Sequence, residues 1–256
     1  MKYFCVSDVH SYYDQLIEAL NNNGFDINNS EHILCVLGDM FDRGPSSVEL
    51  FKFAQQLSNA NRLIYIRGNH EDLLFDAAQQ IFEGKIPDSH HFSNGSIDTI
   101  AQFCNMTKYD FMMHNSVLSS KYVENTMRPI LDWINNTAVN YAEIGNYVLV
   151  HGWIPCYEGL DDFRDATDED WASARWDNGM EMWRYLGCRV DGKTVVCGHW
   201  HCSWGWSHIK QSRPEFPQKN QKDWLKSFEP FIDDGIAAID SCVAYTGKIN
   251  VLVLEV

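Results

Sequence analysis

The sequence has few basic residues and no long apolar segment. Among its 256 residues, 20 are Lys or Arg and 35 are Asp or Glu, which gives a formal net charge of −15. This shortage of cations argues against binding to nucleic acid or to anionic membrane surfaces, because both need clusters of basic residues. No apolar run is long enough to span a bilayer, and the amino-terminal residues read as a strand rather than as a signal peptide. We therefore expect a cytoplasmic protein with no nucleic-acid or membrane partner.

Closely spaced cysteine pairs are also absent. The chain has eight cysteines, but no two of them form Cys-x-x-Cys, which argues against a structural zinc site. Cys5, Cys35, Cys197 and Cys242 lie in apolar runs, where a thiol behaves as a small hydrophobic side chain. The sequence therefore predicts reduced cysteines in the core of a cytosolic protein.

Two common nucleophile motifs are missing as well. The chain contains no Gly-x-Ser-x-Gly segment and no Cys-x5-Arg segment. Hydrolases that attack through an activated serine or cysteine need such a local arrangement around the nucleophile. These absences argue against a covalent enzyme intermediate.

The first third of the chain alternates between strand and helix patterns. Apolar runs predict strands at Lys2–Val6, His32–Leu37 and residues 62–66, and apolar residues at helical spacing follow each of them. Capping boxes that begin at Ser11 and Ser46 are expected to start the first two helices. This alternation predicts an α/β fold with parallel neighbouring strands.

The rest of the chain is less regular. Residues 84–145 are polar and rich in Asn, Met and aromatic residues, with short helical patterns only at 97–103 and 130–134, so we expect an insertion packed on the sheet domain. Strand patterns then return at residues 147–150, Thr194–Cys197, 236–239 and 249–254. No Pro-, Gly- or Ser-rich linker and no repeat divides the chain, which predicts one domain over residues 1–256.

Side chains that can bind metals come just after five of the strand-like runs. They are Asp8, Asp39, Asn69, His151 and His199. His10 lies two residues beyond Asp8, so in an extended segment both side chains would point to the same side. Ligands gather beyond the carboxyl ends of strands in α/β sheets, so we expect these residues to converge. Carboxylate, amide and imidazole ligands suit a pair of divalent metals, and such a pair beside arginines indicates phosphate ester hydrolysis.

These segments resemble the signature of the metallophosphoesterases. The resemblance is greatest to the PPP-type (calcineurin-like) phosphoprotein phosphatases, including small bacterial and phage serine/threonine phosphatases. Residues 38–44 match the family pattern Gly-Asp-x-x-Asp-Arg-Gly, and residues 68–71 match Gly-Asn-His-Glu. The first motif departs from the pattern, because Ser7 and Ser11 replace the glycines that flank it. The resemblance implies a β-sandwich of two mixed sheets flanked by helices, with a helical insertion at about residues 84–145.

The resemblance also implies a role for each motif residue. The implied metal ligands are Asp8, His10 and Asp39 for one ion, and Asp39, Asn69, His151 and His199 for the other. His70, paired with Asp42, would handle the proton of the leaving group, and Arg43 would bind the phosphate. A second phosphate-binding arginine is expected between the last two histidine motifs. Arg175 is the candidate, with Arg164, Arg184 and Arg189 as alternatives.

On this resemblance we expect a phosphomonoester hydrolase, and specifically a serine/threonine phosphoprotein phosphatase that uses a water activated by two divalent metals. Manganese is the expected metal, with iron and zinc as alternatives, and the expected partners are phosphorylated proteins, peptides or other phosphate esters. The alternative function is hydrolysis of diadenosine tetraphosphate by the symmetrical type of hydrolase, which shares most of these motifs. Asp42 and Glu71 favour the phosphatase, whereas Gly198-His199-Trp200 also occurs in the hydrolases.

Other histidines and tryptophans have less defined roles. His201 follows His199 by two residues and is expected outside the set of metal ligands. His90 and His91 lie in a polar stretch and are predicted to be on the surface. Three tryptophans close to the predicted site are expected in the core or in the wall of a substrate groove: Trp200, Trp204 and Trp206.

Overall fold

Two five-stranded sheets form the core of the described part of the chain. The computed structural model describes residues 1–107, 109, 118–157 and 159–256. The first sheet consists of β1 (Lys2–Val6), β2 (His32–Leu37), β3 (Leu63–Ile66), β4 (Ala138–Val139) and β10 (Leu252–Glu255). The second consists of β5 (Ala142–Ile144), β6 (Tyr147–Leu149), β7 (Thr194–Cys197), β8 (Phe231–Asp233) and β9 (Ile236–Ala238).

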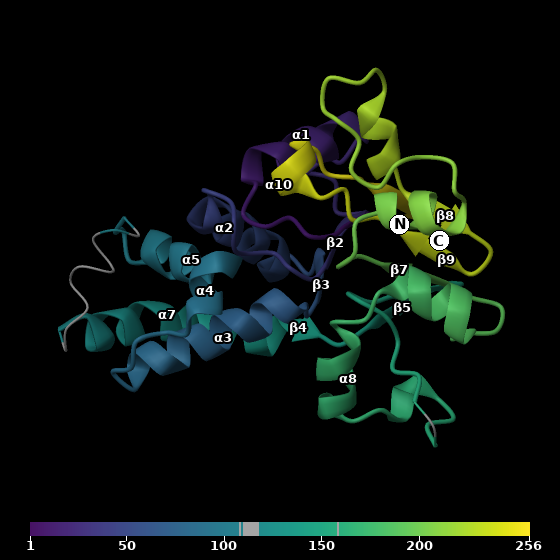
Figure 1. Ribbon diagram of the computed structural model, residues 1–256. Coiled ribbons are helices and arrows are strands. Elements are labelled where there is room, and N and C mark those ends of the chain that lie inside the picture. Colours follow the sequence, from purple (N-terminus) through teal and green to yellow (C-terminus); the bar gives the residue numbers. More distant parts are fainter. Residues whose placement is uncertain (108, 110–117, 158) are drawn as a thin grey trace.

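Parallel strands lie at the centre of both sheets. The order β10-β1-β2-β3-β4 is parallel from β1 to β4, and β10 is antiparallel to β1. The order β5-β6-β7-β9-β8 is parallel from β6 to β9, with an antiparallel strand on each side. The prediction of two mixed sheets is confirmed. Because β1 pairs with β10, the two ends of the chain lie side by side (Figure 1).

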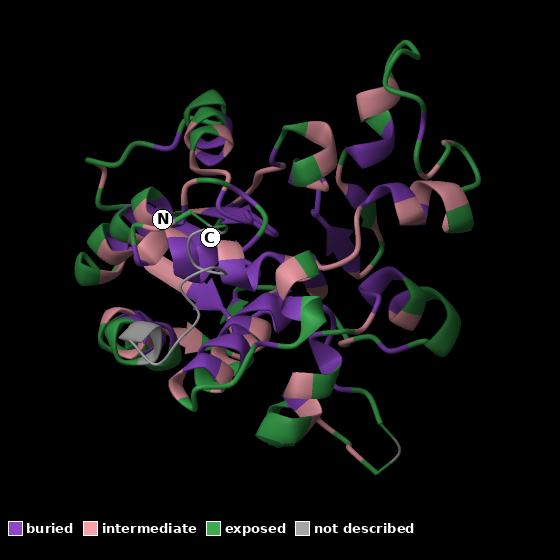
Figure 2. Ribbon diagram, turned by 60° about the vertical axis from the view of Figure 1, so that its left-hand side comes forward, coloured by how far each residue is buried: buried purple, intermediate pink, exposed green. Residues whose placement is uncertain are grey.

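Both faces of the central strands are buried, which explains their nearly continuous apolar sequences. Successive side chains of a strand point to opposite faces. In β2, Val36 therefore packs toward the helices, whereas Cys35 packs against the second sheet, in a layer that includes Leu149 and Val196. Figure 2 shows these strands as the buried centre of the molecule, with exposed residues on the loops and outer helix faces.

Helices cover the outer face of the first sheet. They are α1 (Tyr13–Asn22), α2 (Ser47–Asn59), α3 (Asn69–Phe82), α4 (Ser89–Asn94), α5 (Ser96–Phe103) and α7 (Leu118–Thr137). Leu50, Leu74, Ile100 and Ile134 join these helices and the sheet into one hydrophobic cluster. None of the helices in the described ranges is long and apolar enough to cross a membrane.

Shorter helices surround the second sheet. They are α8 (Asp168–Ala174), α9 (Gly179–Glu181) and the short turns Phe163–Asp165, Met182–Leu186, Gly205–Ile209 and Trp224–Phe228, whereas α10 (Val243–Thr246) packs through Val243 on the cluster of the first sheet. Their cluster is rich in aromatic side chains, including Trp153, Trp171, Trp183 and Phe231. Large aromatic side chains thus fill the space between the second sheet and the short helices around it.

The sequence patterns miss β4, β5 and β8, which have only two or three residues each. So short a segment cannot display an alternating pattern. The described residues of the stretch 84–145 are largely helical, as expected, but the last of them form β4 in the first sheet and β5 in the second. The helical pattern at 130–134 belongs to the much longer α7, in which Pro129 also lies.

The two predicted capping boxes are wrong. The N-caps of α1 and α2 are Tyr12 and Ser46, and neither side chain caps its helix. Ser11 lies in a left-handed turn at φ +60°, and its hydroxyl is 2.8 Å from that of Ser47 at the start of α2. The serine therefore joins two loops instead of capping one helix.

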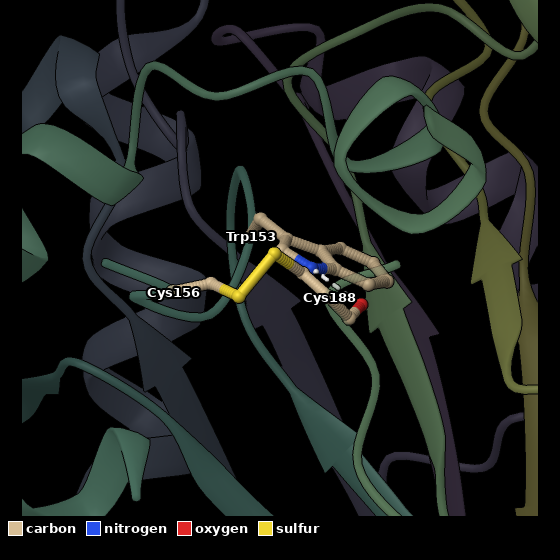
Figure 3. The surroundings of a disulfide bond; sticks show 3 residues. All are labelled: Trp153, Cys156 and Cys188. Carbon is tan, nitrogen blue, oxygen red and sulfur yellow. Dashed lines mark hydrogen bonds between the residues drawn. A yellow bond between two sulfur atoms is a disulfide. The ribbon is translucent and has the colours of Figure 1, made fainter. Parts of the chain in front are cut away.

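A disulfide bond joins Cys156 to Cys188 (Figure 3). Their Cα atoms are 6.1 Å apart, and the nearby Trp153 donates a hydrogen bond to the Cys188 carbonyl at 3.2 Å. The prediction of reduced cysteines is wrong for this pair, because a pairing across 32 residues leaves no close-spacing signal in the sequence. The other six cysteines, all within the described ranges, are free, and five of them are buried.

Removal of this bridge should destabilise the fold. Closing a loop of this length restricts the unfolded chain, so a Cys156→Ala/Cys188→Ala double variant should lose about 3–4 kcal/mol in free energy of unfolding, measured in urea. Reductant should destabilise the wild type but leave the double variant unchanged. Thiol titration of unfolded wild type purified without reductant should find six free thiols. Detection of all eight cysteines as thiols would contradict the pairing.

Candidate metal centre

The polar side chains predicted to bind metal converge at the carboxyl ends of the parallel strands. Asp8, Asp39 and Asn69 follow β1, β2 and β3 of the first sheet, and His151 and His199 follow β6 and β7 of the second. Each sheet therefore supplies part of the site, which explains why the ligands are spread over most of the sequence.

Asp39 lies at the centre of this group. Its Oδ1 is 3.2 Å from His151 Nε2, and its Oδ2 is 3.8 Å from His10 Nε2. Two sets of ligand atoms, each within 4.8 Å of one another, share this carboxylate: His10, Asp39 and His70 form one, and Asp39, His151 and His199 form the other. The shared position is the one expected of a bridging carboxylate.

Asp8 and Asn69 complete the predicted set. Asp8 Oδ1 is 4.0 Å from His10 Nε2, while its Oδ2 accepts hydrogen bonds from the His199 backbone N–H at 2.9 Å and from the Ser7 hydroxyl. The Asn69 amide oxygen is 2.9 Å from His151 Nε2. The structure thus brings together all six side chains that the sequence suggested as metal ligands.

The imidazoles are oriented by backbone carbonyls. His10 Nδ1 lies 2.9 Å from the Phe41 oxygen, and His151 Nδ1 lies 2.8 Å from the Leu37 oxygen. An Nδ1–H that donates to a carbonyl leaves Nε2 with a lone pair directed at the centre, as metal coordination requires. Burial holds the pKa of His10 well below its ordinary value and lowers the pKa of His199 to about 3, so both rings are neutral.

The carboxylates at the centre are poorly compensated by positive charge. Burial, with the nearby Asp8 and Glu71, raises the pKa of Asp39 well above its usual range. Burial and Asp8 do the same to the pKa of Asp240, a carboxylate that directly follows the run ending at Ile239. Divalent cations would relieve this repulsion, so the donor set fits the metals that the resemblance implies.

Left-handed backbone conformations aim the ligands. Asp8, His10 and Asp39 have φ values of 52°, 49° and 52°, so a tight turn, rather than the expected extended segment, brings Asp8 and His10 together. Gly38 and Gly68 are needed for close packing, because a Cβ on Gly38 would lie 2.4 Å from a His151 ring atom and one on Gly68 would lie 2.3 Å from Asp39 Oδ1. Such strained turns commonly lie at functional sites.

Glu71 ties two of these turns to each other. Its carboxylate accepts hydrogen bonds from the backbone N–H groups of Gly68, Asp39 and Met40 at 2.7, 3.0 and 2.9 Å. The side chain is almost fully buried. A shorter Asp at this position would not span the same distance, so Glu71 fixes the spacing between the loops after β2 and β3.

His70 lies between an acid and an arginine. Its Nδ1 is 2.8 Å from Asp42 Oδ2, and its Nε2 is 2.9 Å from an Arg43 guanidinium nitrogen. Burial alone would lower the pKa of His70, but the charges of Asp39 and Asp42 outweigh it and raise the pKa overall. The three residues that the resemblance linked to substrate are therefore mutual neighbours.

Arg175 is engaged away from this cluster. Its guanidinium donates to Asp72 Oδ2 at 2.7 Å and to Asn140 Oδ1 at 2.6 Å, and Arg67 donates to the other oxygen of Asp72 at 2.7 Å. The competing Arg164 is paired with Glu143 at 2.6 Å. The assignment of Arg175 to the substrate phosphate stays a prediction.

Of the histidines outside the signature motifs, His90 and His91 were expected on the surface and His201 outside the set of metal ligands. His91 is fully buried and lies 2.9 Å from Asp76, so the surface prediction is wrong for this residue, because α4 packs it against α3. His90 is exposed, as expected. His201 lies outside both ligand sets in the described part of the chain, with its Nε2 3.0 Å from Glu215.

Two residues close to the site were not singled out from the sequence. Asp240 had a detectable signal, because it follows an apolar run in the same way as Asp8 and Asp39. Trp176 had none: it is 51% exposed, and its ring centroid is 5.9 Å from that of His199. Trp200 packs on the aromatic cluster of the second sheet, as expected of a core or wall residue.

The fold and the site together define a metallophosphoesterase. The chain belongs to the calcineurin-like phosphoesterase family, whose sequence model matches residues 1–203. The resemblance drawn from the motifs is therefore confirmed. The structure of a cold-active protein tyrosine phosphatase has a TM-score of 0.53 with 18% identity, covering 99% of this chain and 73% of that one, which shows the fold alone.

Curated relatives match a shorter part of the chain. An asymmetrical bis(5′-nucleosyl)-tetraphosphatase, PrpE, of Bacillus velezensis is 31% identical over 81 residues, which cover 29% of this chain and 32% of that protein. A symmetrical bis(5′-nucleosyl)-tetraphosphatase of Proteus mirabilis is 34% identical over 88 residues, covering 34% of this chain and 31% of that protein. The chain thus spans about a third of the length of the relatives it matches.

The shared position of Asp39 predicts how metal binding fails. Protein never exposed to chelator should contain about two equivalents of divalent transition metal by elemental analysis. Asp39→Asn should lose most of this metal while the circular dichroism spectrum stays unchanged, because an amide cannot bridge two cations as a carboxylate does.

Asp132→Asn, which removes an exposed carboxylate of α7, is the control and should retain the full metal content. Undiminished metal binding by Asp39→Asn would contradict the bridging role.

Proposed function

We propose that this protein is a metal-dependent phosphomonoester hydrolase that acts on phosphoserine and phosphothreonine in proteins. The observation that carries the proposal is the buried His70–Asp42 pair, with 2.8 Å between His70 Nδ1 and Asp42 Oδ2. Such a pair can deliver a proton to a leaving group. The pair lies beside Arg43 and the carboxylate of Asp39.

The proposed metal ligands are the six side chains of the centre, with manganese as the metal. Asp8, His10 and Asp39 would hold one cation. The other cation would be held by Asp39 together with Asn69, His151 and His199. When bound, the two cations would activate a water for attack and neutralise the phosphoryl oxygens.

The protein's own groups would orient the ester and its leaving group. Arg43 lies next to His70 Nε2, so a phosphoryl group held by its guanidinium would place the ester oxygen near that imidazole. Asp42 fixes His70 through Nδ1, which leaves Nε2 as the atom that exchanges the proton. Arg175 is proposed as the second arginine for the phosphate and would have to leave Asp72 to reach it.

The leaving group distinguishes this function from polyphosphate cleavage. A serine or threonine alkoxide is strongly basic and must be protonated as the P–O bond breaks. A nucleotide leaves as a phosphate anion of much lower basicity and gains little from a proton donor. A buried His–Asp pair is therefore more useful for phosphoserine than for a dinucleoside polyphosphate.

Hydrolysis of diadenosine tetraphosphate is the second candidate function. It is favoured by the names of the matched relatives, which are bis(5′-nucleosyl)-tetraphosphatases, both asymmetrical and symmetrical. The exposed Trp176 beside His199 could also stack against a base. Rates on a phosphoserine peptide and on diadenosine tetraphosphate, measured side by side with manganese, should favour the peptide, and the reverse order would favour the second candidate.

A cytoplasmic location is part of the proposal, and the Cys156–Cys188 bridge bears on it. Disulfides persist mainly in oxidising compartments, whereas cytosolic thiols are kept reduced. In the cytoplasm the protein would therefore be expected to work with this bridge reduced, and the bridge would form once the protein is purified without reductant.

A His70→Asn variant should separate the chemical step from binding. Loss of the proton donor should lower turnover of a phosphoserine peptide on the order of 10²–10⁴-fold, with little change in KM or metal content. p-Nitrophenyl phosphate has a leaving group that departs without a proton, so its turnover should fall much less. Equal losses on both substrates would contradict the proton-donor role and indicate that His70 orients the metals instead.

A further inference from the structure

The start of α5 holds the carboxylate of Asp42. The Ser96 hydroxyl donates to Asp42 Oδ2 at 2.9 Å, and the Thr99 hydroxyl donates to Oδ1 at 2.8 Å. Thr99 Oγ1 also accepts a hydrogen bond from the Asp42 backbone N–H at 3.0 Å. All three residues have no exposed surface, so water cannot replace these contacts without disturbing the packing.

The same helix also holds the backbone that follows Asp42. A Cβ on Gly95 would lie 2.3 Å from the Arg43 nitrogen, which shows how closely the two segments pack. The Gln102 side chain donates to the Gly44 carbonyl at 2.9 Å and accepts from the Ser47 N–H at 2.8 Å. The contacts therefore extend along the whole loop from Asp42 to Ser47.

This loop needs external support. Asp42 and Arg43 have consecutive φ values of 73° and 63°, a conformation that is unfavourable for residues other than glycine. The packing of α5 on the loop can hold Asp42 and Arg43 in this conformation. The hydroxyls of Ser96 and Thr99 fix the Asp42 carboxylate directly by their hydrogen bonds.

The hydroxyls are not used to cap α5. The N-cap of this helix is Gly95, and no side chain makes a capping hydrogen bond there. Ser96 and Thr99 lie one turn apart on the helix and direct both hydroxyls at the same carboxylate. Their position is thus explained by Asp42 rather than by the helix.

We infer that Ser96 and Thr99 are positioning residues for the His70–Asp42 pair. Their hydroxyls fix the orientation of the Asp42 carboxylate, so that its Oδ2 accepts a hydrogen bond from His70 Nδ1. The imidazole is thereby held with Nε2 directed toward the leaving group. The inference rests on the proposed function, because it gives His70 the role of proton donor. It also assigns a task to the stretch 84–145, which lies outside the signature motifs.

The test compares Thr99→Val, which keeps the shape but removes the hydroxyl, with Thr99→Ser, which retains it. Loss of a hydrogen bond to a charged group should lower phosphoserine turnover by roughly 10- to 100-fold in Thr99→Val and Ser96→Ala. KM and the rate on p-nitrophenyl phosphate should change little, and Thr99→Ser should behave as the wild type. Thr126→Val is the matched control, because the Thr126 hydroxyl donates within its own helix to the Tyr122 carbonyl.

Two further measurements distinguish failure of this inference from failure of the proposed function. In a His70→Asn background, Thr99→Val should cause no additional loss, because both changes act through one pair. The low-field Nδ1–H proton resonance of His70 should shift or broaden in Thr99→Val and stay unchanged in Thr126→Val, whether or not phosphoserine is the substrate.

If the wild type fails to hydrolyse phosphomonoesters but the resonance shifts as described, the proposed function fails and the positioning role stands. The inference is overturned if Thr99→Val leaves the resonance unchanged. It is equally overturned if Thr99→Val and Thr99→Ser lose activity to the same extent on both substrates.

Discussion

The gathering of several buried carboxylates in one small volume is the constraint on which the rest of the structure depends. Asp8 and Glu71 disfavour the charge of Asp39, and Asp8 and Asp39 disfavour that of Asp240. Such repulsion is tolerable only where cations and hydrogen-bond donors are supplied in return. The strained turns, the close approach of Gly68 to Asp39 and the oriented imidazoles place hydrogen-bond donors and candidate metal ligands around these carboxylates.

The two sheets divide this task between them. The first sheet provides mainly oxygen atoms as candidate ligands at the ends of its parallel strands, and the second provides imidazoles at the ends of its own. The helices of the stretch 84–145 add a third contribution, since Ser96 and Thr99 reach the acid that orients His70. Residues from the first sheet and from α5 thus meet at the His70–Asp42 pair, and the second sheet adds its imidazoles around Asp39.

The sequence predicts best what is carried by local motifs. The strands before Asp8, Asp39 and Asn69, and the convergence of the candidate metal ligands, follow from apolar runs that end in short polar segments. The Cys156–Cys188 bridge, the burial of His91 and the contacts of Asp42 with α5 could not be predicted in this way. Each depends on two segments that meet only after the chain has folded, so neither segment alone carries a periodic or spacing signal.

The short passage between β4 and β5 has a mechanical consequence. The chain leaves the first sheet at Val139 and enters the second at Ala142, and Asn140, in between, accepts a hydrogen bond from Arg175. So short a connection restricts movement of the two sheets relative to each other at this point. Because the candidate ligands come from both sheets, a fixed relative position of the sheets would keep the distances between these ligands constant.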